Sequence, residues 1–127
     1  MAGDPHPWLQ SYPENVQWDA EIPEGPLFAI LDESVRRFPD NEAMDFLGRT
    51  WSYAELGAMV DRAAAGFRAL GVEKGVKVGL FLPNCPQFVA AFFGILKAGG
   101  TVVNYSPLYS EEELAYQIED SETDIMV

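Results

Sequence analysis

The sequence predicts an α/β fold: a parallel sheet with helices on both faces, preceded by a short hairpin and an extended N-terminal arm. Strand-like and helix-like patterns alternate from Val76 onward, and the loops between them are short. Strands joined by helical crossovers run parallel and carry helices on their faces. Of the 127 residues, 48% are hydrophobic, which is enough to bury a core and excludes a wholly disordered chain. The length corresponds to one domain or to part of one.

The charge is strongly acidic and unevenly distributed. The formal net charge of −12 excludes a nucleic-acid binder, which needs a basic face to neutralise phosphates. Residues 1–35 and residues 98–127 each carry seven acids and no base, whereas residues 36–97 carry all eight bases. Acidic flanks of this kind are typical of a solvated surface.

The first 26 residues predict an extended arm. Residues 1–26 contain five prolines together with Trp8, Tyr12 and Trp18. Proline disfavours regular helix and sheet, and large aromatic side chains favour contact with a surface over a free tail. We therefore expect this arm to lie on a surface of the protein or of a partner chain.

A helix and a hairpin follow the arm. The helical face consists of apolar residues at spacings of four, four and three: Leu27, Leu31, Val35 and Phe38. Its other face offers two acid–base pairs four residues apart, Asp32–Arg36 and Glu33–Arg37, and Pro39 ends it. In residues 42–52 a Gly48-Arg49 turn joins two short arms, and glycine at the first central position suits a type II′ turn.

The next helix begins at Ser52. Ser52 and Glu55 form a capping box, in which each side chain accepts a hydrogen bond from the other residue's backbone N–H. The apolar face of the helix is formed by Tyr53, Leu56, Val60, Ala63, Phe67 and Leu70. Gly71 suits a left-handed cap at its end, and the small residues at 63–66 allow a neighbouring element to approach closely.

Three strands and two helices complete the pattern. Residues 76–82 predict a strand that is covered on both faces, and residues 87–98 predict a buried helix because they are apolar nearly all round. A second strand is expected at residues 101–105. Ser110 and Glu113 form a second capping box that opens a helix to about Ser121. Residues 124–127 begin a third strand.

The residues provide no phosphate cradle. The segment Gly94–Thr101 imitates a P-loop, but Gly100 replaces the lysine and the segment closes a helix before a strand, so we interpret it as a helix cap. The chain lacks G-x-G-x-x-G, and no serine or threonine is followed by glycine.

Neither a metal site nor a cysteine–histidine pair is expected. The acidic cluster is interpreted as a solvated helix face because it lacks the spacing of an EF-hand loop: Glu111, Glu112, Glu113, Glu119, Asp120, Glu122 and Asp124. The single cysteine, Cys85, lies far along the chain from the single histidine, His6, and is interpreted as a packing or loop residue.

The composition favours a cytoplasmic protein. One cysteine cannot form an intrachain disulfide, the N-terminus does not resemble a signal peptide, and the longest apolar run, residues 88–96, is too short for a transmembrane segment of about 20 residues.

Five segments stand in a specific order and spacing: Trp51–Leu56, Ala69–Gly75, Val78–Asn84, Phe92–Gly99 and Glu112–Ile118. Together they resemble the N-terminal part of the adenylate-forming enzymes, which include acyl-CoA synthetases, luciferases of the firefly type and peptide-synthetase adenylation domains. The resemblance implies that residues 27–127 are a partial N-terminal α/β lobe of an AMP-binding domain, truncated before its phosphate-binding loop.

Two further segments resemble the branch of medium- and long-chain fatty-acid–CoA ligases: Trp8–Pro13, and Val103–Tyr109 with its Asn-x-x-Pro-Leu-Tyr pattern. The resemblance implies a carboxylate that attacks ATP with Mg²⁺ to give an acyl-adenylate, and coenzyme A that then displaces AMP. The family's catalytic, nucleotide-binding and metal-binding residues lie beyond residue 127. We therefore expect no site residue in this chain, no specific cofactor binding and no activity of the fragment alone.

Two alternatives remain open: a stand-alone, non-catalytic α/β interaction module, and another adenylating branch such as an aryl-CoA ligase or a luciferase-like enzyme. Fatty acid, ATP and coenzyme A are the partners implied for the parent enzyme. The resemblance and the aromatic arm together predict a homodimer formed through residues 1–26, against the equally weighted alternative that the arm packs on its own lobe.

Overall fold

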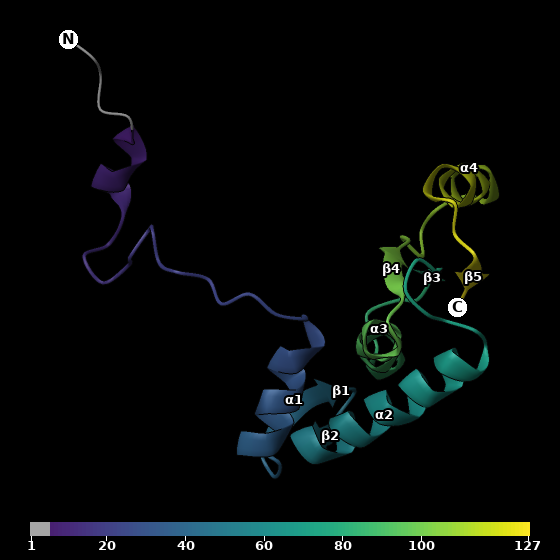
Figure 1. The fold of residues 1–127 in the computed structure, drawn as a ribbon, viewed down its shortest axis with the longest axis horizontal. Helices are drawn as coiled ribbons and strands as arrows, with labels where there is room; N and C mark the ends of the chain where they lie inside the picture. Colours follow the sequence, from purple (N-terminus) through teal and green to yellow (C-terminus); the bar gives the residue numbers. More distant parts are fainter. Residues whose placement is uncertain (1–5) are drawn as a thin grey trace.

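The computed structural model describes residues 6–127 and shows an arm, a hairpin with two helices, and a three-stranded sheet (Figure 1). The first five residues of the predicted arm lie outside the described range. In chain order the elements are η1 (Pro7–Ser11), α1 (Phe28–Arg37), β1 (Glu42–Phe46), β2 (Arg49–Ser52), α2 (Tyr53–Ala69), β3 (Lys77–Leu80), α3 (Pro86–Ala98), β4 (Thr101–Asn104), α4 (Glu111–Ser121) and β5 (Ile125–Met126).

The sheet confirms the predicted fold class. Its strand order is β4-β3-β5, and both pairings are parallel, with Val78 opposite Val102 on one side and Ile125 on the other. The chain moves from β3 to β4 through α3 and returns past β3 to β5 through α4. Right-handed crossovers in opposite directions place the two helices on opposite faces, and α3 and α4 do lie on opposite sides of the strands in Figure 1.

The main core lies between β3 and the helices α2 and α3. Val78, Leu80 and Ile95 are fully buried in it. The two helices approach closely at Gly94, where an added Cβ would lie 2.7 Å from the Cβ of Ala63. The small residues predicted to permit such an approach thus do so. Helix α3 is less enclosed than expected, because several of its large side chains, Phe88 and Phe92 among them, are only half-buried.

Both predicted capping boxes are present. Ser52 accepts from the Glu55 backbone and Ser110 from the Glu113 backbone, and each glutamate accepts in return. Gly71 and Gly99 take the left-handed conformation after their helices, with φ of +87° and +97°. Strand β3 is shorter than predicted, at Lys77–Leu80 instead of 76–82.

The hairpin forms, but its predicted turn is wrong. Its central residues are Leu47 and Gly48, not Gly48 and Arg49, because Arg49 already pairs with Phe46. Leu47 and Gly48 have φ of +53° and +80°, so the turn belongs to type I′ instead of type II′. A register shift between Glu42 and Met44 adds a bulge to the first strand.

One predicted ion pair of α1 is also wrong. Glu33 contacts both Arg36, at 2.7 Å, and Arg37, at 3.9 Å. Asp32 does not pair with Arg36; its carboxylate accepts a 2.6 Å hydrogen bond from Lys97 Nζ on α3 instead. A contact between helices therefore replaces the local pair.

The arm extends away from the lobe (Figure 1), which differs from the alternative in which it packs on its own lobe. It also contains one regular element, because Pro7 opens the short 3-10 helix η1. The rings of His6, Trp8 and Trp18 contact one another, with centroid distances of 4.6 to 6.4 Å. The aromatic residues of the arm thus pack partly on each other and remain substantially exposed.

Candidate functional site

The carboxyl ends of β3, β4 and β5 form the edge of the sheet at which a ligand site is expected. The loop after β3 leads to α3 on one face, and the loop after β4 leads to α4 on the other. In doubly wound sheets, the crevice between such diverging loops is the usual position of the ligand. The residues available there are those of 81–86 and 104–110.

The loop between β3 and α3 does not fit a phosphate group. A phosphate loop at this position needs glycines and free backbone N–H groups that point at the anion. Here Pro83 and Pro86 flank Asn84 and Cys85, so two of the four residues lack an N–H, and Pro86 occupies the first turn of α3. The chain therefore supplies no nucleotide cradle at this loop, and we derive no catalytic step from it.

The segment after β4 is occupied by structural contacts. Tyr105 is buried, and its hydroxyl lies 2.7 Å from Ser121 Oγ and 2.6 Å from Thr123 Oγ1, which connects the end of β4 to the end of α4. Its ring covers Gly79 of β3, where an added Cβ would lie 2.6 Å away. Because both contacts hold the Tyr105 hydroxyl between β4 and the end of α4, this side chain acts as a structural link.

The glycine-rich segment Gly94–Thr101 is a helix cap, as interpreted. Gly99 is the left-handed C-cap of α3, and its N–H is donated to the Leu96 carbonyl. Gly100 lies against Val72 and Ile95, where an added Cβ would clash. The glycines thus serve backbone geometry and packing.

The acidic residues of α4 face solvent. Glu113 accepts hydrogen bonds from the Ser110 backbone in the capping box, which lowers the pKa of its carboxyl. Within residues 6–127, no three His, Cys, Asp or Glu side chains are grouped so that they could hold a metal ion. The charge of this helix stabilises its positive N-terminal end.

Cys85 and His6 lie in different parts of the structure. Cys85 is the N-cap residue of α3 and is half-buried, next to Met44 and Phe46 of the hairpin in a pocket of about 410 Å³. His6 packs against Trp8 and Trp18 in the arm. In the described part of the chain, no helix is both long and apolar enough to cross a membrane.

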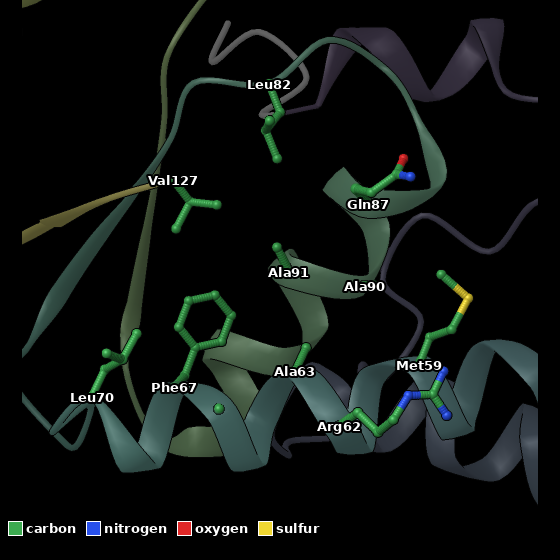
Figure 2. A pocket seen from close by; sticks show the side chains of 11 residues that line it. Met59, Arg62, Ala63, Phe67, Leu70, Leu82, Gln87, Ala90, Ala91 and Val127 are labelled. Carbon is green, nitrogen blue, oxygen red and sulfur yellow. The ribbon is translucent and has the colours of Figure 1, made fainter.

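An apolar groove lies between α2 and α3, where the sequence predicted no pocket. We call it the α2–α3 groove; it has a volume of about 740 Å³, and Figure 2 shows side chains from both helices and from the ends of β3 and β5 pointing into it. Its lining residues are Met59, Arg62, Ala63, Gly66, Phe67, Leu70, Leu82, Gln87, Ala90, Ala91 and Val127. The one sequence signal was the small-residue stretch at 63–66, of which Gly66 leaves open space here.

The sequence is similar to that of known enzymes. A family model described as "AMP-binding enzyme" matches residues 31–127. The long-chain-fatty-acid–CoA ligase of Bacillus subtilis is 38% identical over 121 residues, which cover 95% of this chain and 22% of that protein. The corresponding ligase of Escherichia coli is 37% identical over 117 residues, 90% of this chain and 21% of that protein. Syringomycin synthase SyrB1 of Pseudomonas syringae is 38% identical over 101 residues, 80% of this chain and 16% of that protein.

Solved structures show the same arrangement of helices and strands. A complex of VinN with 3-methylaspartate superposes with a TM-score of 0.77 at 28% identity, covering 80% of this chain and 28% of that chain. The N-terminal subdomain of NpsA from Klebsiella oxytoca gives a TM-score of 0.78 at 22% identity, covering 82% and 27%. The chain spans about a fifth of the length of the curated ligases that it matches.

Proposed function

Because this chain belongs to the AMP-binding enzyme family, we propose that it is the N-terminal part of a fatty-acid–CoA ligase. The observation that carries the proposal is its 38% identity to a long-chain-fatty-acid–CoA ligase along 95% of its length. In the proposed reaction a fatty-acid carboxylate attacks the α-phosphate of ATP, which releases pyrophosphate and forms an acyl-adenylate. The thiol of coenzyme A then attacks the acyl carbon, and AMP leaves as the thioester forms.

Within that reaction, residues 27–127 act as a scaffold, and catalytic, cofactor-binding and metal-binding residues come from the rest of a family-length polypeptide. Three observations support this division. The strand–loop–helix turn at Pro83–Pro86 cannot cradle phosphate, the glycine-rich segment is a helix cap, and the Tyr105 hydroxyl is taken up by Ser121 and Thr123. A cytoplasmic location belongs to the same proposal and is supported by the single cysteine.

The test uses a chimera in which residues 1–127 replace the matching segment of the Bacillus subtilis ligase. AMP release is measured with ATP, Mg²⁺ and coenzyme A in the presence of a fatty acid, an aryl acid or an amino acid. We expect AMP and acyl-CoA with fatty acids only. A chimera that folds but releases AMP with none of these acids contradicts the ligase assignment.

A second candidate is an amino-acid-adenylating branch of the same family. The 38% identity to syringomycin synthase SyrB1 and the likeness to the VinN complex with 3-methylaspartate favour it. In the same assay it predicts pyrophosphate release that depends on an amino acid, with an aminoacyl-adenylate as the product and no acyl-CoA.

Association through the arm is a further part of the proposal. The arm leaves the lobe with Trp8, Tyr12 and Trp18 exposed. These aromatic side chains are therefore free to pack against a partner chain. Light scattering on the 127-residue chain and on a version that starts at Pro26 measures the mass of each particle. We expect a dimer only when the arm is present; the same oligomeric state for both chains contradicts a role for the arm.

A further inference from the structure

Lys97 is one of three lysines in the chain, and it joins helices through its ammonium group. It lies on α3, and its Nζ contacts Asp32 of α1 at 2.6 Å and Asp61 of α2 at 2.8 Å. The hydrogen bonds to these carboxylates raise the pKa of Lys97 because they stabilise the charged form. Since only the neutral amine is a nucleophile, the same contacts lower the reactivity of Lys97 toward electrophiles.

Lys77 is held in a similar way at the start of β3. Its Nζ donates at 2.8 Å to the Ser121 carbonyl at the end of α4, and at 2.8 Å to the carboxylate of Glu122. The hydrogen bond from Lys77 lowers the pKa of Glu122, so the pair is charged at neutral pH. This amine must leave both acceptors before it can attack an electrophile.

Lys74 differs from the other two lysines. It lies exposed in the turn between α2 and β3, and its Nζ makes no hydrogen bond or ion pair with any residue of 6–127. Its amine can therefore lose a proton and react without breaking a contact. Loss of its charge would also leave the packing of the helices and strands unchanged.

We propose that Lys74 is the lysine of this chain that acyl-CoA thioesters acylate, while their ion pairs protect Lys77 and Lys97. The neutral amine attacks the thioester carbonyl, an amide C–N bond forms and the C–S bond breaks. The proton of the amine passes to the departing thiolate, which leaves as coenzyme A. The inference rests on the proposed function, because a fatty-acid–CoA ligase is exposed to the thioester that it makes.

The test uses acetyl-CoA as the thioester, which reacts without any ligase activity. The 127-residue chain is incubated with it at about pH 8, where a small fraction of lysine side chains is neutral. Peptide mass spectrometry follows the acetylation of each lysine over time. We expect Lys74 to react at least about threefold faster than Lys77 or Lys97, and the three rates to converge in denaturant, where the ion pairs are lost.

Matched variants test whether the ion pairs protect the other two lysines. Asp61→Asn should raise the acetylation rate of Lys97 about twofold to threefold and leave Lys74 unchanged, because it removes one of the two carboxylates. The control Asp45→Asn changes an exposed carboxylate that makes no ion pair within residues 6–127, and it should alter none of the rates. Glu122→Gln should raise the rate of Lys77 in the same way.

The outcomes separate this proposal from the ligase assignment. Equal rates for the three lysines in the folded chain, or faster acetylation of Lys77 or Lys97 than of Lys74, would overturn the proposal. It fails equally if neither Asp61→Asn nor Glu122→Gln raises the rate of its partner lysine. Selective acetylation of Lys74 supports the proposal even where the chimera is inactive, whereas an active chimera with three equal rates leaves only the ligase assignment intact.

Discussion

Leu47 and Glu122 are the two non-glycine residues of the described chain that take a positive φ, and Leu47 does so in the hairpin turn. It takes φ of +53° in the hairpin turn, a region that costs an L-residue about 1–2 kcal/mol. Its side chain is 91% exposed, so no burial offsets that cost. The alternating pattern of residues 42–52 predicted the hairpin, but it could not place the turn, because nothing in a leucine signals a left-handed backbone.

The first prediction follows from this turn. Leu47→Asn should raise the free energy of unfolding by about 0.5–1 kcal/mol, because Asn-Gly is strongly preferred in type I′ turns and asparagine adopts the left-handed region readily. Urea denaturation measures the change. Leu108→Asn is the matched control, since Leu108 is also 91% exposed but does not have a positive φ. Equal effects of the two substitutions would show that lost apolar surface, not turn geometry, is the cause.

Tyr105 supports a second prediction. Its buried hydroxyl contacts Ser121 and Thr123, so Tyr105→Phe should lower the free energy of unfolding by about 1 kcal/mol. The control Tyr116→Phe, at a position that is 71% exposed, should leave stability unchanged. The same denaturation series measures both. A neutral Tyr105→Phe would mean that Ser121 and Thr123 satisfy each other through their own 2.8 Å contact.

The helices were predictable from the sequence because their signals are local. Capping boxes, apolar spacing and a terminal glycine all act within a few residues, and the structure places α2 and α4 where those signals predicted them. Contacts between elements were not predictable in the same way. Asp32 pairs with Lys97, 65 residues away, instead of with Arg36 one turn along its helix, because packing α1 near α3 brings the ammonium within reach.

Lys97 yields the third prediction, since it joins three helices. Its Nζ lies 2.6 Å from Asp32 on α1 and 2.8 Å from Asp61 on α2. The hydrogen bond to Asp32, and to a lesser extent the one to Asp61, raises the pKa of the Lys97 ammonium. Lys97→Met should lower the free energy of unfolding by about 1 kcal/mol at neutral pH, whereas the exposed Lys74→Met should not.

The pH dependence of that difference follows from the direction of the shift. Because the pKa of Lys97 is higher in the folded state, its contribution is complete below the ordinary lysine value of about 10.4 and is lost as the pH rises through the raised pKa. The stability gap between the wild type and Lys97→Met should therefore close at strongly alkaline pH. A gap that persists there would assign the effect to the aliphatic stem instead of the charge.

At the level of the whole molecule, the parallel sheet and its covering helices were predictable, whereas the arm's course and the α2–α3 groove were not. The order of strand and helix patterns determines the topology through the handedness of crossovers. The groove is the space that side chains from three distant segments leave unfilled between them. The periodicity of any one segment does not encode that space.

In the proposed ligase, this chain provides the scaffold while residues elsewhere in the polypeptide perform the chemistry. The most direct test incubates the 127-residue chain with ATP, Mg²⁺, a long-chain fatty acid and coenzyme A, and quantifies acyl-CoA against a control without protein. We predict no acyl-CoA above that control, with the chimera as the positive reference. Acyl-CoA formed by the chain alone would contradict the account, because it would place the catalytic machinery within these 127 residues.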